Sequence, residues 1–265
     1  MTDPLPATHE GWDPTQYLRF GDERLRPALD LLARVPLAEP QRVCDLGCGT
    51  GNVTEWLARR WPQAALTGVD GSMAMLERAR QALPDVHWQQ ADIGRWRPDA
   101  PFDLIFSNAA LHWLPDHAQL LPALMRALKP GGVLAVQMPH NFHAPSHTLI
   151  TDTLQAGPWR DTLLPMLGPA PVAAPADYFD MLQPLAAEID IWQTEYLQVL
   201  SGADPVKEWT KGTWLKRFLD ALPAPESAEF EAAYAERVRV AYPALADGRT
   251  LFPFRRLFIV ARRGP

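Results

Sequence analysis

The sequence predicts an α/β protein with a Rossmann-like, mostly parallel sheet, and three observations support this. Short apolar runs alternate with helical periodicity from about residue 41 to 138. The first run, at 43–45, is followed at once by a glycine-rich turn and a helical segment. Later runs also end on polar residues, among them Asp70 and Ser107. Alternating strands and helices form parallel sheets with right-handed crossovers, which bind ligands at the carboxyl ends of their strands.

The order of the elements follows from periodicity, caps and breakers. We expect an N-terminal lid helix over about 13–35, with Asp13 as N-cap and Pro14 at its first position. Further helices are expected over about 51–61, from the N-cap Ser72 onward, and over about 116–129. Apolar runs and alternation predict strands at about 41–45, 65–70, 86–89, 101–107, 133–138, 189–200 and 251–262. Two stretches are predicted helical cap elements, so we expect a single domain over residues 1–265 with caps at about 140–187 and 201–249.

Composition limits the class of protein. The 265 residues are 47% hydrophobic, enough for one large core. No apolar run approaches about 18 residues, and the N-terminus lacks the pattern of a signal peptide. Cys44 and Cys48 are the two cysteines, and they predict neither a disulfide nor a metal site. We therefore expect a cytoplasmic protein without a membrane segment or a metal.

The distribution of charge indicates the kind of partner. The net charge of −6 argues against nucleic acid, because binding phosphates requires a basic face. Residues 205–265 carry eleven Lys and Arg against seven Asp and Glu, which suits a small anionic substrate. Those charges equally suit a solvated helix surface. No protein partner is predicted.

The glycine-rich turn predicts a nucleotide-type binding loop. Gly47, Gly49 and Gly51 separate a buried strand from a helix N-terminus, and glycine permits unusual φ angles and close approach of a ligand. Asp70 lies 19 residues beyond Gly51, where a carboxylate can bind both ribose hydroxyls. Asp92 follows the third strand. A glycine turn alone is also compatible with no ligand, and the two acidic residues favour the binding loop.

These residues resemble a known family. Asp-x-Gly-x-Gly-x-Gly at 45–51, with Asp70 and Asp92, resembles the class I S-adenosylmethionine (SAM) methyltransferases. Longer phrases, such as Ser-Asn-Ala-Ala-Leu-His-Trp at 107–113 and Val-Lys-Glu-Trp-Thr-Lys-Gly-Thr at 206–213, resemble the trans-aconitate methyltransferase family. The resemblance implies a seven-stranded sheet whose last strand is antiparallel, inserted between strands 5 and 6. It also implies SAM as cofactor, Asp92 at the adenine amino group and a small polycarboxylate as substrate. His140 departs from the family pattern, in which we would expect an acidic residue at this position.

Thirteen residues are predicted to bind the cofactor. Most lie at the carboxyl ends of the first four strands. Tyr17 and Arg24 belong to the lid helix. They either face the methionine end of SAM, or Tyr17 packs against the protein and Arg24 is solvated. The predicted cofactor-binding residues are Tyr17, Arg24, Asp45, Gly47, Cys48, Gly49, Asp70, Gly71, Ser72, Met73, Asp92, Ile93 and Asn108.

The expected chemistry needs no general base. A carboxylate is ionised near neutral pH and can attack the methyl carbon in line, so we predict no catalytic side chain. Basic and amide groups would hold the non-reacting carboxylates. Arg255 and Arg256 cannot both do so, because neighbours on a strand face opposite sides. The predicted substrate-binding residues are His112, Trp113, His140, His147, Lys211, Arg249 and Arg255.

Other functions remain open on the sequence. The chain could methylate another small metabolite, or bind SAM as a non-catalytic regulator, because a fold does not determine a function. An NAD-dependent oxidoreductase is disfavoured by the glycine spacing and by Asp92, which has no clear role in such an enzyme.

Overall fold

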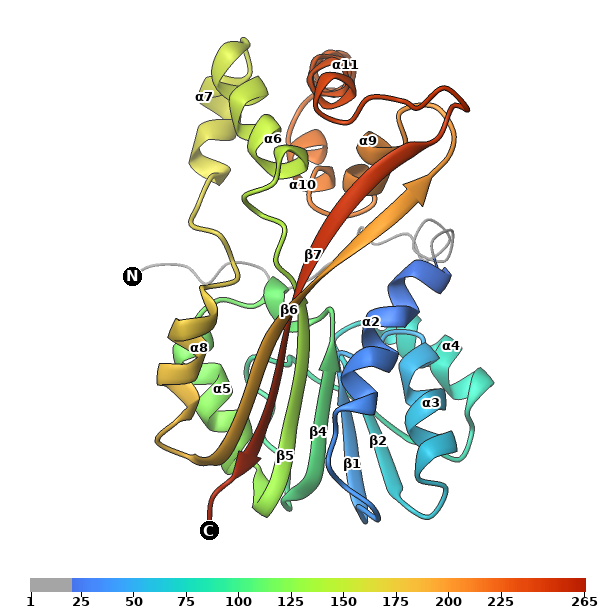
Figure 1. The fold of residues 1–265 in the computed structure, drawn as a ribbon, viewed down its shortest axis with the longest axis vertical. Helices are drawn as coiled ribbons and strands as arrows, with labels where there is room; N and C mark the ends of the chain where they lie inside the picture. Colours follow the sequence, from blue (N-terminus) through green and yellow to red (C-terminus); the bar gives the residue numbers. More distant parts are fainter. Residues whose placement is uncertain (1–20) are drawn as a thin grey trace. The chain divides into compact units, whose positions relative to one another are not determined.

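The computed structural model describes the backbone of residues 21–265 and the side chains from residue 25 onward. Its strands form one seven-stranded sheet in the order β3-β2-β1-β4-β5-β7-β6 (Figure 1). Strands β1 to β5 pair in parallel and β7 is antiparallel, as predicted. The strands are β1 (Arg42–Leu46), β2 (Ala65–Asp70), β3 (His87–Gln90), β4 (Phe102–Asn108), β5 (Leu128–Pro139), β6 (Ala186–Leu200) and β7 (Thr250–Arg263).

The chain forms two compact units. In the described part of the chain, the first comprises residues 21–138, Ala173–Gln193 and Leu257–Pro265. Here α2 packs on α3, α4 packs against β2 and β3, and α5 packs on α8. The helices of this unit are α2 (Gly21–Ala33), α3 (Asn52–Arg60), α4 (Met73–Ala82), η1 (Leu111–Trp113), α5 (His117–Arg126) and α8 (Pro175–Leu182).

The second unit comprises Pro139–Val172 and Thr194–Arg256. Within it α11 contacts α6, α9 and α10, and Trp159 packs edge-on against Phe230 with ring centroids 5.2 Å apart. None of the helices in the described part of the chain is long and apolar enough to cross a membrane. The helices of this unit are α6 (Pro145–Ala156), α7 (Arg160–Leu163), η2 (Leu164–Met166), α9 (Pro205–Lys211), α10 (Lys216–Asp220) and α11 (Ala224–Ala241).

The boundaries around β5 differ from the prediction. We expected the helix to continue to about 129 and the strand to begin at 133, but α5 ends at Arg126 and β5 begins at Leu128. The strand starts early because Leu128 pairs with Phe102, after which the register shifts. A Cβ on Gly132 would lie 2.9–3.1 Å from three backbone oxygens, so this glycine allows a close passage within the strand.

The predicted lid helix is described in part. The helix α2 begins at Gly21 in the described chain and ends before Pro36, close to the expected end. Asp13 and Tyr17 lie outside the described residues, and so does the side chain of Arg24. The predicted cap range 140–187 contains α6, α7, η2 and α8, of which α8 belongs to the first unit. The prediction that residues 1–265 form a single domain stays a prediction.

Candidate functional site

The turn after β1 is built so that only glycine fits at its first position. Gly47 has a φ of +79°, and a Cβ added there would lie 2.2 Å from the Cβ of Ala110. Its amide donates to the carbonyl of Val69 at the end of β2, with N and O 2.7 Å apart. The loop after β4 and the end of β2 therefore both lie against this turn, and a side chain at position 47 would collide with that loop.

The carboxylate of Asp70 is fixed at the carboxyl end of β2. The amide of Gly49 donates to its Oδ2 at 2.9 Å, and the amide of Ser72 donates to its Oδ1 at 2.8 Å. Each oxygen thus receives one N–H and retains capacity for a further donor such as a hydroxyl. Ser72 is also the N-cap of α4, as predicted, because its Oγ accepts from the amide of Met75 at 3.4 Å.

Three predicted residues, two just after β3 and one at the end of β4, offer groups suited to a purine ligand. Asp92 accepts from the amide of Gly94 at 2.9 Å and keeps 44% of its side chain exposed. The Cδ1 of Ile93 approaches within 3.4 Å of a Cβ built on Gly47, so an apolar side chain borders the glycine turn. The Oδ1 of Asn108 is buried with no hydrogen-bond partner within the described part of the chain. An unsatisfied buried acceptor next to this turn fits a ligand that donates hydrogen bonds.

Asp45 is a buried carboxyl beneath the turn. Its Oδ2 accepts from the hydroxyl of Thr54 at 2.6 Å. Burial raises the pKa of Asp45 to about 7, the hydrogen bond from Thr54 opposes the rise, and the charge of Asp70 adds to it. A cationic ligand nearby would favour the ionised form of this carboxyl.

The remaining predicted cofactor residues differ in what they can offer. The side chain of Cys48 packs with Leu76, Ala79 and Trp88 in the core, and burial raises the pKa of its thiol, so its backbone is the part left for a ligand. Both cysteines are unbridged. The carbonyl of Gly71 accepts from Gln90 at 3.2 Å. Sequence reasoning missed Ala110, whose small side chain the close approach of Gly47 requires.

Two predicted substrate residues, His112 and Trp113, lie in η1 of the first unit. Their ring centroids are 4.6 Å apart, and His112 is buried. The neighbouring His117 has a structural role, since its Nδ1 lies 2.7 Å from the hydroxyl of Tyr178 and its Nε2 lies 2.9 Å from the carbonyl of Leu111. These bonds hold η1 in place.

Five predicted substrate residues belong to the second unit: His140, His147, Lys211, Arg249 and Arg255. The amide of His140 donates to the carbonyl of Arg255 at 2.9 Å, so their backbones are neighbours. Arg255 is exposed and Arg256 is buried, which confirms that the two face opposite sides of β7. Arg255 pairs with Glu195 at 3.4 Å, and Arg249 pairs with Asp247 at 2.6 Å.

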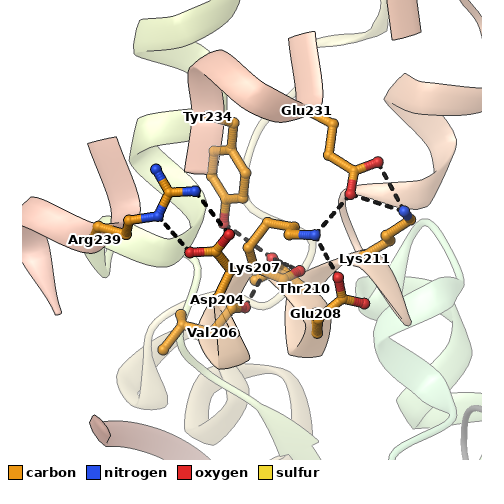
Figure 2. A network of polar contacts seen from close by, with 9 residues as sticks. All are labelled: Asp204, Val206, Lys207, Glu208, Thr210, Lys211, Glu231, Tyr234 and Arg239. Atoms are coloured by element: carbon orange, nitrogen blue, oxygen red, sulfur yellow. Dashed lines mark hydrogen bonds and ion pairs between the residues drawn. The ribbon is translucent and has the colours of Figure 1, made fainter. Parts of the chain in front are cut away.

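Lys211 is part of an ion-pair network between α9 and α11 (Figure 2). Its Nζ lies 2.8 Å from both carboxylate oxygens of Glu231. Lys207 pairs with the same carboxylate at 2.8 Å and with Glu208. Burial lowers the pKa of Lys207, but the two glutamates outweigh this and raise it overall. Much of the basic character of this segment is thus balanced within the unit.

His147 lies in a buried aromatic and polar environment. Its Nδ1 is 3.1 Å from the Oγ of Ser146, and its ring packs edge-on against Phe142 with centroids 5.1 Å apart. Burial, together with the positive charge of Arg217, lowers the pKa of His147 to about 4. The imidazole is therefore neutral near pH 7. Arg217 itself was not predicted, although its position three residues after Trp214 was a visible signal.

Solved structures share the fold. A phosphoethanolamine N-methyltransferase 2 from Haemonchus contortus, in complex with S-adenosyl-L-methionine, aligns with a TM-score of 0.55 at 18% identity, covering 91% of this chain and 53% of that one. The YcgJ protein from Bacillus subtilis aligns with a TM-score of 0.57 at 18% identity, covering 91% and 99% of the two chains. At such identities the likeness shows the fold alone.

Sequence relatives show the family. Residues 43–132 match the family described as methyltransferase domain. A trans-aconitate 2-methyltransferase from Azoarcus sp. (strain BH72) is 54% identical, covering 95% of this chain and 99% of the relative. The protein of the same name from Methylobacterium nodulans is 51% identical, covering 95% and 98%. The chain therefore belongs to the trans-aconitate 2-methyltransferase family of SAM-dependent methyltransferases.

Proposed function

We propose that the protein transfers the methyl group of SAM to one carboxylate of trans-aconitate, forming a monomethyl ester in the cytoplasm. The observation that supports this most is the identity of 54% to a relative of that name over nearly the whole length of both chains. The fixed carboxylate of Asp70 and the glycine turn support the SAM half of the proposal independently.

In this proposal the first unit binds SAM, whose positively charged sulfur makes its methyl group electrophilic. Asp70 accepts hydrogen bonds from the ribose hydroxyls, and Asp92 accepts one from the adenine amino group. Ile93 packs against the adenine, and the Oδ1 of Asn108 gains a donor. The glycine turn at Gly47 brings the backbone close to the ligand, and the predicted contributions of Gly49, Cys48 and Gly71 are backbone ones.

The acceptor carboxylate is itself the nucleophile, so the enzyme acts by alignment and by removal of water. Positioning of reactants can contribute about 7–11 kcal/mol to lowering a barrier. A strong general base is not needed. His147 suits this chemistry because a group whose pKa is lowered to about 4 is a weak base at neutral pH.

The predicted substrate residues are the first candidates for holding the non-reacting carboxylates. His112 and Trp113 follow β4, and His140, His147, Lys211, Arg249 and Arg255 belong to the second unit. Among the cations, Lys211, Arg249 and Arg255 each have a carboxylate partner in the protein, which a substrate would have to displace or share.

An acceptor panel with labelled SAM tests the proposal. The panel contains trans-aconitate, cis-aconitate, isocitrate, fumarate, and a neutral amine and phenol. We expect trans-aconitate to give the highest kcat/KM and the product to be a base-labile methyl ester. A neutral acceptor that outperforms every polycarboxylate would overturn the proposed substrate and leave SAM binding intact.

A further inference from the structure

Arg217, on α10 of the second unit, is half-buried and has no carboxylate beside it within the described part of the chain. Its Nε is buried and lacks a hydrogen-bond partner among the described residues. Burying a guanidinium without a counter-ion is costly, so a site of this kind suits an anionic ligand. Several other cations of this unit are paired: Lys207 and Lys211 with Glu231, Lys216 with Asp220, Arg239 with Asp204, Arg249 with Asp247 and Arg255 with Glu195.

The guanidinium of Arg217 is held by aromatic rings rather than by acids. Its Cζ lies 3.7 Å from the ring centroid of Trp214 and 4.6 Å from that of Phe218. A ring against the face of a guanidinium leaves the N–H groups along its edge available. Those N–H groups match the two oxygens of a carboxylate, which arginine binds with paired hydrogen bonds.

The aromatic residues around Arg217 carry no charge of their own. Phe142 packs edge-on against Trp214 with centroids 5.1 Å apart, and His147 packs on Phe142 at the same distance. Burial lowers the pKa of Arg217 to about 10, so the guanidinium stays protonated at neutral pH. His147 is neutral at that pH, so Arg217 is the charged member of this aromatic cluster.

We propose that Arg217, stacked on Trp214, binds one non-reacting carboxylate of the acceptor and thereby determines the preference for a tricarboxylate over a dicarboxylate. This inference rests on the proposed function and deepens it. It assigns the recognition of the third carboxylate to a half-buried cation that is stacked on Trp214 and has no described carboxylate beside it, rather than to Lys211, Arg249 or Arg255.

The test compares Arg217→Gln and Arg217→Lys in the full-length enzyme with Lys216→Met, which removes a charge from the same helix. We expect Arg217→Gln to lower kcat/KM for trans-aconitate roughly 10- to 100-fold, mainly through KM, because a charge-assisted contact is lost. Turnover of fumarate, which lacks the third carboxylate, should change by less than about threefold. Arg217→Lys should be intermediate, since it keeps the charge without the paired donors. In Arg217→Ala, millimolar guanidinium should restore part of the turnover of trans-aconitate.

Two outcomes separate this inference from the proposed function. If the wild-type enzyme methylates trans-aconitate and a folded Arg217→Gln variant keeps the ratio of trans-aconitate to fumarate kcat/KM, Arg217 does not recognise the third carboxylate and the proposed function stands. If the wild-type enzyme binds SAM and methylates no polycarboxylate, the proposed function fails, and the assignment of Arg217 fails with it. Circular dichroism and titration of SAM establish that each variant is folded.

Discussion

The proposed SAM-binding part of the first unit and the charged part of the second unit differ in the kind of contact that holds them together. Around Gly47 and Asp70 the contacts run through the backbone, with amides donating to a strand carbonyl and to a carboxylate. In the second unit the contacts run between side chains, as in the pairing of Lys211 with Glu231. Backbone contacts follow from where strands end, whereas side-chain pairs depend on which helices meet. A site held by backbone contacts can be recognised from a short stretch of sequence. A site held by side-chain pairs cannot, because its residues come from separate helices.

The largest loss of SAM affinity is expected at Gly47, where the structure leaves no space for a side chain. Gly47→Ala should weaken SAM binding roughly 100- to 1,000-fold, because a left-handed φ strains the residue and the added Cβ meets that of Ala110. Gly49→Ala is the matched control, since its φ is +55° and nothing lies within 4 Å of its added Cβ. It should cost about tenfold. Calorimetric titration of SAM checks both, and equal losses in two folded variants would contradict the steric explanation.

A double variant separates strain from collision at the same position. Adding Ala110→Gly to Gly47→Ala removes the atom that the new Cβ meets and leaves the left-handed φ unchanged. The double variant should therefore bind SAM about as weakly as Gly49→Ala does. No recovery relative to Gly47→Ala would mean that the backbone conformation alone causes the loss.

The next largest effect concerns the second unit, where His147 should make the free energy of unfolding depend on pH. His147 has a pKa lowered to about 4 against an ordinary value of 6.5, so the unfolded chain takes up its proton first as pH falls. The stability it contributes is present above about pH 6.5 and is lost as pH falls toward 4, by roughly 3 kcal/mol. The charged group facing it is Arg217.

His147→Phe should remove this part of the pH dependence, because phenylalanine keeps an aromatic ring but has no nitrogen that can take up a proton. Urea unfolding of wild type and variant at several pH values between 4 and 8 gives the difference in free energy of unfolding. We expect the two curves to converge or cross as pH falls below 6.5, and parallel curves would show that His147 is not held neutral.

Asp70→Ala is expected to weaken SAM binding less than Gly47→Ala does, and to affect no property other than the affinity for SAM. A hydrogen bond to a charged group contributes about 1.5–3 kcal/mol, so affinity should fall roughly 10- to 100-fold. The variant also removes the acceptor of the Gly49 and Ser72 amides, which is why Asp70→Asn, which keeps an acceptor oxygen, is the matched control. Unchanged affinity in a folded Asp70→Ala protein would remove Asp70 from the cofactor site.

What could be predicted from the sequence follows the same difference between local backbone patterns and contacts between distant side chains. The strand ends, the glycine turn and the N-cap Ser72 were predictable because each is a local pattern with one physical cause. The close approach of Ala110 to Gly47 was not predictable, because the two residues are far apart in sequence and an alanine gives no distinctive sequence signal. The start of β5 was missed because Lys-Pro-Gly-Gly is typical of a turn, while pairing with Phe102 extends the strand through it.

The charged residues of the second unit show why composition could not assign the substrate site. An excess of Lys and Arg after residue 205 was consistent with an anionic ligand, but the pairs of Lys211 and Arg249 show where part of that excess is used. Arg217 has the same charge and a different environment, with Trp214 in place of an acid. A sequence lists charges equally, and only their contacts separate a paired cation from one that is open to a ligand.

The smallest expected effect decides the role of Lys211, which the sequence assigned to substrate. Its Nζ contacts both oxygens of Glu231 in a partly exposed pair, and such pairs contribute about 0–1 kcal/mol to stability. Lys211→Met should therefore lower the free energy of unfolding by less than about 1 kcal/mol. Because Glu231 already balances this charge, kcat/KM for trans-aconitate should fall by less than about threefold, far less than for Arg217→Gln. Lys207→Met is the matched comparison, since Lys207 shares Glu231 and is more buried, so it should lose more stability with as little effect on turnover. A tenfold loss of kcat/KM in a stable Lys211→Met enzyme would instead place Lys211 at the substrate, with Glu231 as the partner that positions it.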